Sequence, residues 1–233
     1  MNSRGGNWNL PDAGLSRDAE YWEQRFAAGN TPWELHGPSC VLIESLKGVV
    51  GDELDLRGLT ILVPGCGTGA DAMELASRGA SVVAVDWAQY ACDQLNSRLA
   101  GHDLKDSLGS VRVVHGDFFS VAHEPVDIVV EHTFFCAIDP SRRPEYVSAI
   151  LRWLKPGGYL VGNFFVLSEQ EARELPGLSL TKEGSGPPFA TTESELAGLF
   201  AQHFTTICLQ QAKVGAQGRR PGMEWSGSFR LVE

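Results

Sequence analysis

A glycine-rich turn followed by an acid makes residues 61–86 the segment best suited to chemistry. The stretch ILVPGCGTGADAMELASRGASVVAVD predicts a buried strand, a turn, a helix and a second strand that ends in Asp86. Gly65, Gly67 and Gly69 let the backbone turn sharply and approach a ligand, and the following helix directs its free N–H groups there. Asp86 could accept both hydroxyls of a ribose. The segment therefore predicts an adenosine-containing cofactor at the edge of a parallel sheet.

The spacing of the glycines does not separate the possible cofactors. The chain reads G-x-G-x-G-A, so Ala70 satisfies the looser form of the dinucleotide fingerprint. A plain strand-to-helix turn is an alternative for the glycines, and an ordinary capping acid is the alternative for Asp86.

Bulk composition favours one α/β domain that binds a small molecule. The chain has 233 residues, 43% of them hydrophobic, which is enough for a core. It carries 19 Lys and Arg against 29 Asp and Glu, a formal charge of -10, and no basic cluster is longer than Arg219-Arg220. We therefore expect no nucleic-acid partner. Apolar runs are strand-sized and the first residues contain no apolar signal-peptide core, so we expect a cytoplasmic protein without a membrane partner, and by default a monomer.

The cysteines and histidines do not predict a metal site. The five cysteines form no C-x-x-C pair, and their odd number favours reduced thiols. His115, His123 and His132 fall on different predicted elements, which does not match the spacing of metal ligands.

Alternating strand and helix patterns predict the elements that position these residues. We expect residues 1–15 to be disordered and residues 16–233 to form a single domain with a helical cap at its N-terminal end. Five strands alternate with helices, which indicates a Rossmann-like α/β fold with helices on both faces. The last two strands have no helix between them and predict an antiparallel hairpin that completes a seven-stranded, mostly parallel sheet. The predicted helices cover 17–28, 40–47, about 70–78, 88–99, 143–154 and 192–201, and the strands cover 61–64, 81–86, 111–116, 126–132, 159–165, 203–211 and 223–233.

Several longer motifs occur in the order seen in one enzyme family. YWEQRF, TPWE, VPGCGTGADAMELASRGASVVAVD, GDFF, EHTFFCAIDPSRRPEY, LKPGG and GPPF resemble the thiopurine S-methyltransferase family of class I S-adenosylmethionine-dependent methyltransferases. The resemblance is strongest to its halide and thiol methyltransferase branch and runs from about Tyr21 to the end of the sequence. It implies transfer of a methyl group from S-adenosyl-L-methionine to a small molecule, with S-adenosyl-L-homocysteine as the product.

The resemblance also implies a set of cofactor contacts. Aromatic residues near the N-terminal end of the family close over the positively charged cofactor, although tryptophan is usual where this chain has Phe26. The glycine turn would follow the methionine portion, Asp86 would hold the ribose, and the GDFF segment would contact the adenine. An apolar helix face packed on the sheet is the alternative for Trp22 and Phe26. The expected cofactor-binding residues are Trp22, Phe26, Trp33, Gly65, Cys66, Gly67, Gly69, Asp86, Trp87, Asp117, Phe118, Glu131 and His132.

His132 departs from the family pattern at the same sheet edge. The halide and thiol branch commonly has Asp-Tyr-Thr where this chain has Glu131, His132 and Thr133. A free thiol has a pKa of about 8.5, so little of it is thiolate at neutral pH, and a histidine of pKa about 6.5 could take the proton. We therefore interpret His132 as a general base or a polar wall of the acceptor pocket. An imidazole that only forms hydrogen bonds is the alternative.

The expected reaction is an in-line displacement that needs positioning more than catalytic groups. Trp22, Phe134, Phe135 and Phe189 are expected to line the acceptor pocket, and residues 168–189 could form a lid. The two phenylalanines after the strand could instead belong to the core, and the lid could be an idle loop.

The sequence leaves the acceptor open. A thiopurine-like, aliphatic or aryl thiol, or a secondary-metabolite thiol, is favoured because His132 suits a nucleophile that must lose a proton. Halide, thiocyanate or hydrosulfide methylation and small-molecule O- or N-methylation are alternatives. Outside methyl transfer, a nicotinamide oxidoreductase would share the turn and the acid, and a module that binds the cofactor without turnover would share all the binding residues.

Overall fold

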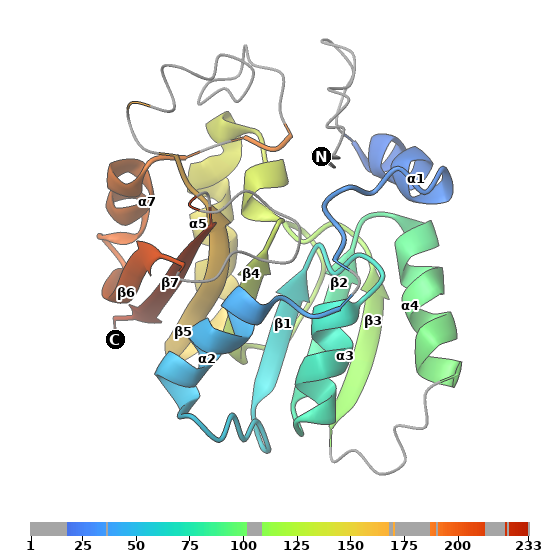
Figure 1. Cartoon of the computed structure of the whole chain (residues 1–233), viewed down its shortest axis with the longest axis horizontal. Coiled ribbons are helices and arrows are strands. Elements are labelled where there is room, and N and C mark those ends of the chain that lie inside the picture. The colour runs from blue at the N-terminus through green and yellow to red at the C-terminus, as the bar shows by residue number, and fades with distance from the viewer. Residues whose placement is uncertain are drawn as a thin grey trace, which may run out of the picture.

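A seven-stranded sheet in the order β3-β2-β1-β4-β5-β7-β6 organises the chain (Figure 1). The computed structural model describes residues 18–35, 37–101, 109–167, 170, 187–189, 191–212, 222 and 224–232. The expected disorder of residues 1–15 and most of the expected lid lie outside this range. The strands are β1 Thr60–Pro64, β2 Ser81–Asp86, β3 Ser110–His115, β4 Val126–His132, β5 Leu154–Phe165, β6 Phe204–Gln211 and β7 Glu224–Leu231.

The first five strands are parallel, so their carboxyl ends share one edge of the sheet. Ile61 pairs with Val82 on β2 and with Ile128 on β4, which sets β1 at the centre of this part of the sheet. The apolar runs ILV and VVAV are almost fully buried, as expected for strands covered on both faces.

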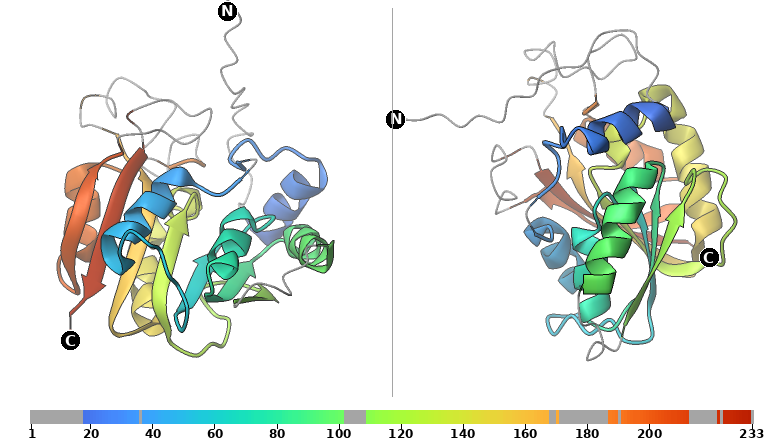
Figure 2. Two further views of the ribbon diagram at one scale, coloured as in Figure 1. Left: turned by 60° about the horizontal axis from the view of Figure 1, so that its bottom comes forward. Right: turned by 90° about the vertical axis from the view of Figure 1, so that its right-hand side faces the viewer.

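Helices cover both faces of the sheet, as predicted (Figure 2). The core on one face contains side chains of α2, α3 and α4, and the core on the other contains side chains of α5 and α7. Short 3-10 turns at Phe135–Ala137 and Pro140–Arg142 connect β4 to α5. The helices are α1 Ala19–Ala27, α2 Cys40–Val50, α3 Ala70–Ser77, α4 Gln89–Gly101, α5 Arg143–Trp153 and α7 Glu193–Phe200.

Helix α1 forms a cap beside the start of α4 (Figure 1). Asp18 begins the helix, because its side chain accepts a hydrogen bond from the N–H of Tyr21 at 3.1 Å. Phe26 is 6% exposed and packs against Ala88 and Ala91. Burial of this ring attaches the cap to the carboxyl edge of β2, where α4 starts.

The final hairpin is present and occupies an interior position. Strand β7 pairs antiparallel with both β5 and β6, so it lies between two strands that precede it in the chain. Strand β5 starts at Leu154, earlier than the predicted residue 159, because the LKPGG segment continues directly into the sheet. Gly157 has φ 72°, which allows the turn within this segment.

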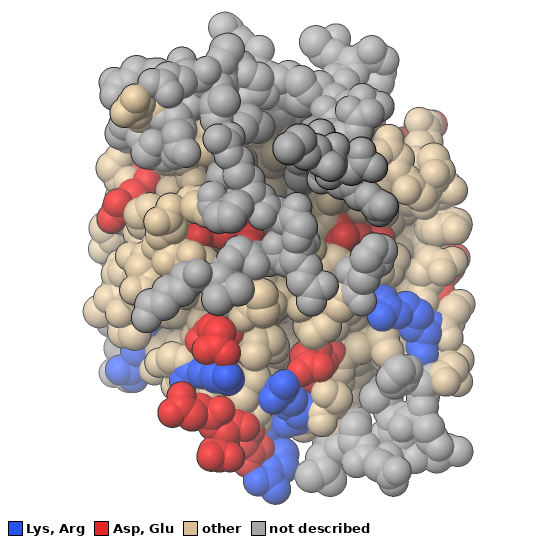
Figure 3. Space-filling view, in the orientation of Figure 1, with Lys and Arg blue, Asp and Glu red and all other residues tan. Residues whose placement is uncertain are grey.

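Charged side chains of both signs are interspersed on the lower part of the face in Figure 3. Ion pairs join Lys47 to Glu44 at 2.6 Å and Arg78 to Glu74 at 2.5 Å.

Among the residues that the structure describes, no helix is long and apolar enough to cross a membrane.

Candidate active site

The glycine turn after β1 lies against the carboxylate of Asp86. Gly65, Gly67 and Gly69 have φ values of 57°, 53° and 84°, a region in which only glycine is unstrained. Asp86 accepts from the N–H of Gly67 at 2.8 Å and from the N–H of Ala88 at 2.9 Å. Burial raises the pKa of Asp86 to about 6, although these two hydrogen bonds favour the ionised form. Asp86 is 7% exposed and lies at the end of β2, the position predicted for an acceptor of the ribose hydroxyls.

The aromatic residues of the N-terminal segment form a cluster over α4. The rings of Trp22 and Trp33 are 5.4 Å apart and those of Phe26 and Trp33 are 5.7 Å apart, both edge-to-face. Arg25 lies 4.8 Å above the ring of Trp33. Phe26 belongs to the buried interior of the cap, whereas both tryptophans remain partly exposed.

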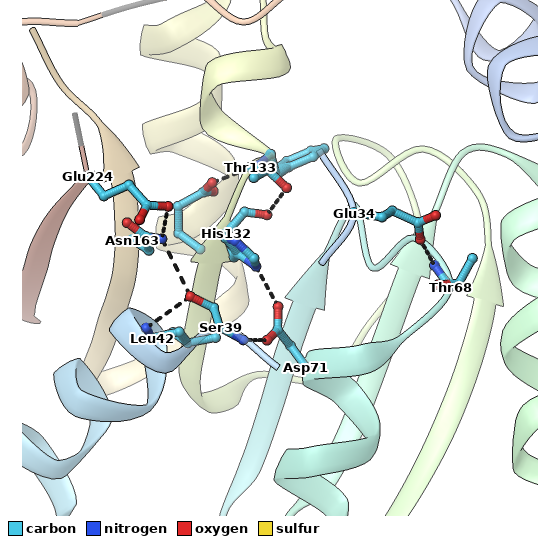
Figure 4. A network of polar contacts seen from close by, with 11 residues as sticks. Glu34, Ser39, Leu42, Thr68, Asp71, His132, Thr133, Asn163 and Glu224 are labelled. Atoms are coloured by element: carbon cyan, nitrogen blue, oxygen red, sulfur yellow. Dashed lines mark hydrogen bonds and ion pairs between the residues drawn. The ribbon is translucent and has the colours of Figure 1, made fainter. Parts of the chain in front are cut away.

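Glu34, which sequence reasoning missed, ties the TPWE segment to the glycine turn. Its Oε1 accepts from the N–H of Thr68 at 3.0 Å (Figure 4). A Cβ added to Gly67 would lie 3.2 Å from the same oxygen. The contact places the segment that carries Trp33 beside the turn.

The GDFF segment follows β3 at the same sheet edge. Asp117 accepts from the N–H of Phe119 at 2.9 Å and keeps partial exposure, so its other oxygen could contact a base. The Phe118 ring is 4% exposed in the core, which leaves only its backbone for the expected adenine contact. Trp87 stands between Asp86 and Ala88 and is partly exposed.

Glu131 is held by the protein itself. Its Oε1 accepts from the N–H groups of Phe134 at 2.9 Å and Phe135 at 2.7 Å, and its Oε2 accepts from the hydroxyl of Tyr146 at 3.1 Å. The side chain is 1% exposed, and burial raises its pKa to about 7. Thr133 has φ 63°, which turns the chain so that the next two N–H groups face Glu131. This carboxylate therefore holds the turn after β4, a role that differs from the expected cofactor contact.

His132 forms a partly buried pair with Asp71, an acid that is not among the predicted site residues. Its Nδ1 is 2.7 Å from Oδ2 of Asp71, in the first turn of α3, and the two side chains are 10% and 14% exposed. Within the part of the chain that the structure describes, the other ring nitrogen, Nε2, is buried and has no hydrogen-bond partner. Leu62 of β1 pairs with Val129, so the end of β4 runs beside the glycine turn. A buried nitrogen without a partner at this edge is a candidate contact for a ligand.

Further polar groups form a hydrogen-bonded network with the Asp71–His132 pair (Figure 4). The N–H of Ser39 donates to Oδ1 of Asp71 at 2.8 Å. Nδ2 of Asn163 donates to Glu224 at 2.9 Å and to Oγ of Ser39 at 3.4 Å. Two signals could have revealed these residues: Asp71 is an acid in the first helical turn after the glycines, and Asn163 is a lone polar residue in the apolar strand YLVGNFF.

The residues expected in the acceptor pocket separate into two groups. Phe134 is partly exposed, and a Cβ added to Gly65 would lie 2.5 Å from its Cδ2, so its ring covers the turn. Phe135 and Phe189 are 2% and 0% exposed and fill the core. We therefore keep Phe134 and Trp22 as candidates for the pocket wall and assign the other two rings to the core.

All five cysteines are free thiols. Burial raises the pKa of the Cys66 thiol well above its usual value, so this side chain packs as a neutral group, and only its backbone lines the turn. Among the residues that the structure describes, no three or more His, Cys, Asp and Glu side chains form a group that could hold a metal ion.

These residues fit an adenosine-based methyl donor. A glycine turn after β1, a buried acid at the end of β2, an aromatic cap and the antiparallel β7 define a class I S-adenosylmethionine-dependent methyltransferase. Burkholderia thailandensis 1,6-didemethyltoxoflavin-N1-methyltransferase has a similar fold, with a TM-score of 0.68 and 21% identity over 95% of this chain and 93% of that one. The chain belongs to the thiopurine S-methyltransferase family, whose model matches residues 17–226.

Two relatives with curated names agree with this family. A probable thiol methyltransferase 2 of Arabidopsis thaliana is 30% identical over 90% of this chain and 84% of its own length. A thiopurine S-methyltransferase of Vibrio cholerae is also 30% identical, over 79% of this chain and 81% of its own length. The predicted family, fold and methyl donor are thereby confirmed.

Proposed function

We propose that this methyltransferase acts on the sulfur of a small thiol and that His132 accepts the thiol proton. The observation that carries the proposal is the Asp71–His132 pair, which uses Nδ1 of the imidazole and leaves the buried Nε2 without a partner among the described residues. A neutral imidazole whose Nδ1–H faces a carboxylate has a lone pair at Nε2. That lone pair is suited to accept a proton beside the donor site.

The donor site is proposed on the residues at the carboxyl ends of β1, β2 and β3. Asp86 would accept the ribose hydroxyls, Asp117 would accept from the adenine amino group, and Trp22 and Trp33 would cover the cationic sulfur. S-adenosyl-L-methionine, when bound, supplies a methyl group whose bond to sulfur breaks with both electrons remaining on that sulfur.

The protein's own part in the reaction is to position the acceptor and move one proton. The S–H proton of the acceptor passes to Nε2 of His132, and the sulfur electron pair forms the new bond to the methyl carbon. The resulting imidazolium stays paired with the Asp71 carboxylate until the proton leaves to water. General bases of this kind contribute about 10²- to 10⁴-fold to a rate.

A thiol fits this arrangement better than the other acceptors. Halide and thiocyanate ions carry no proton to remove, so a buried base would be idle toward them. An alcohol has a much higher pKa than a thiol, and a histidine would ionise it poorly. The names of both relatives refer to thiol or thiopurine methylation, which supports sulfur as the acceptor atom.

A methylation assay tests the proposal. Purified protein is incubated with S-adenosyl-L-methionine and, separately, an alkyl thiol, an aryl thiol, a thiopurine, iodide, thiocyanate and hydrosulfide, and the products are identified by mass spectrometry. We expect methylated thiol as the main product. Transfer to iodide or thiocyanate alone would contradict the proposal.

The pH–rate profile of His132→Phe examines the proton transfer. We expect the acidic limb of kcat/KM for an alkyl thiol, present in the parent, to disappear in the variant together with most of the rate. His203→Phe, a change in the turn before β6, is the control and should keep the parent profile. An unchanged acidic limb in His132→Phe would remove His132 as the base.

A further inference from the structure

Asp71 is placed to decide which nitrogen of His132 carries the proton. We infer that Asp71 is a positioning residue that holds His132 in the Nδ1–H tautomer, and that this allows the site to use acceptors which arrive as un-ionised alkyl thiols. The inference rests on the proposed function, because it assigns the substrate class and the tautomer of the same site.

The two oxygens of Asp71 have separate donors. Oδ1 accepts from the backbone N–H of Ser39 at 2.8 Å, and Oδ2 is 2.7 Å from Nδ1 of His132. A backbone N–H can only donate, so Oδ1 must accept. An ionised carboxylate accepts at both oxygens, so the ring nitrogen that faces Oδ2 must be the one with the hydrogen. Nε2 is therefore the unprotonated nitrogen of the neutral ring.

The position of Asp71 is itself fixed. Asp71 lies in the first turn of α3, where the helix dipole favours a negative charge. Ser39, which is 0% exposed, is the N-cap of α2, and its Oγ accepts from the N–H of Leu42 at 3.3 Å. Two helix starts thus meet at the Asp71 carboxylate.

Two further acids lie on β4 itself and on β7. Glu131 lies on the same strand, but its carboxylate faces Tyr146 on α5, on the opposite side of the sheet. Glu224 on β7 is connected to the pair through Asn163 and Ser39. Asp71 on α3 is the acid in direct contact with the imidazole.

The tautomer determines which acceptors benefit. An un-ionised thiol needs a lone pair at Nε2 to receive its proton, whereas a thiol that is already thiolate needs none. The hydrogen bonds from Ser39 to Asp71 and from Asp71 to His132 therefore raise the rate only for acceptors whose pKa lies above the pH of the assay. Alkyl thiols meet this condition, and aryl thiols with electron-withdrawing groups do not.

Asp71→Asn is the decisive variant, because the backbone of Ser39 fixes the orientation of the new amide. The amide oxygen must face the Ser39 N–H, so the amide NH₂ faces Nδ1 of His132 and donates to it. The ring must then carry its hydrogen on Nε2, where it can no longer accept the thiol proton. Asp71→Glu keeps a carboxylate and should keep the parent tautomer.

The first readout is the tautomer itself, in protein without any ligand. Long-range ¹H–¹⁵N NMR spectra distinguish a protonated from an unprotonated Nδ1, and the signals of His132 among six histidines are assigned by their loss in His132→Phe. We expect the Nδ1–H form in the parent and in Asp71→Glu, and the Nε2–H form in Asp71→Asn. An Nε2–H form in the parent would overturn the inference, even if Asp71→Asn does not fold.

The second readout compares two acceptors. For Asp71→Asn we expect kcat/KM to fall by about 10²-fold or more with an alkyl thiol, and to change by less than about threefold with a nitro-substituted aryl thiol that is already ionised. Asp71→Glu should recover most of the alkyl-thiol rate. Asp93→Asn, on the exposed side of α4, controls for the change of charge and should match the parent with both thiols.

The outcomes separate this inference from the proposed function. Equal losses with both thiols would show a merely structural Asp71 and overturn the inference while leaving thiol methylation intact. If the parent methylates no thiol at all, the proposed function fails, whatever the NMR spectra show.

Discussion

Replacement of Glu131 by glutamine should make the protein more stable at neutral and alkaline pH. Glu131 is 1% exposed, with Oε1 facing the N–H groups of Phe134 and Phe135 and Oε2 facing the hydroxyl of Tyr146. In Glu131→Gln the amide oxygen can accept both N–H groups, and the amide nitrogen can donate to the Tyr146 oxygen. The substitution therefore removes a buried charge and keeps the hydrogen bonds.

The magnitude follows from the pKa of the buried carboxyl. Burial raises the pKa of Glu131 from 4.5 to about 7, so the folded state binds this proton more tightly than the unfolded state does. Its contribution to stability is present below pH 4.5 and is lost as the pH rises to about 7. At about 1.4 kcal/mol per pH unit, the variant should exceed the parent by about 1 kcal/mol at pH 5 and about 3 kcal/mol at pH 8.

Urea unfolding followed by tryptophan fluorescence at pH 5 and pH 8 measures this difference. Asp86, whose pKa is also raised by burial, to about 6, is present in both proteins, so its titration cancels in the comparison. Glu145→Gln is the matched control, since Glu145 is half exposed beside Arg142 and its replacement should change stability little. A difference between Glu131→Gln and parent that is the same at both pH values would refute the reasoning.

Two other predictions concern the turn after β1. Asp86→Asn should weaken the binding of S-adenosyl-L-homocysteine by about ten- to a hundredfold in calorimetry, the value of a charge-assisted hydrogen bond, and affinity equal to that of Asp93→Asn would count against the ribose assignment. Gly69→Ala should lower the free energy of unfolding by about 2–3 kcal/mol, because Gly69 has φ 84° and a Cβ would lie 2.2 Å from Cδ1 of Leu95. Gly48→Ala, in an open position of α2, should instead raise it by about 0.5–1 kcal/mol, and similar effects of the two substitutions in urea melts would contradict the packing argument.

Much of the fold follows from local patterns in the sequence. The alternation of apolar strands with amphipathic helices predicts the parallel half of the sheet, and the absence of a helix between the last two strands predicts the hairpin. Asp86 could be predicted because a single segment contains both the turn and the acid. The early start of β5 could not, since proline and two glycines normally interrupt a strand.

The hydrogen-bonded network around His132 could not be predicted from the sequence, because it depends on contacts between distant segments. Asp71 and His132 are 61 residues apart, and their contact depends on the angle at which α3 leaves the turn. Glu131 shows a different limit. Successive side chains of a strand point to opposite faces, so Glu131 and His132 cannot share one ligand from the same side. The period of the strand contains that information.

The interior position of β7 has a consequence for the newly made chain. When only the residues up to Gln211 have been synthesised, β7 is missing. Strand β5 then lacks its antiparallel partner, and β6 lacks the strand with which it pairs. Glu224, the first residue of β7, also belongs to the hydrogen-bonded network that includes Asn163 and leads to His132. The addition of β7 therefore completes both the sheet and the hydrogen-bonded network around His132. A nascent chain that lacks β7 has an incomplete sheet and an incomplete network.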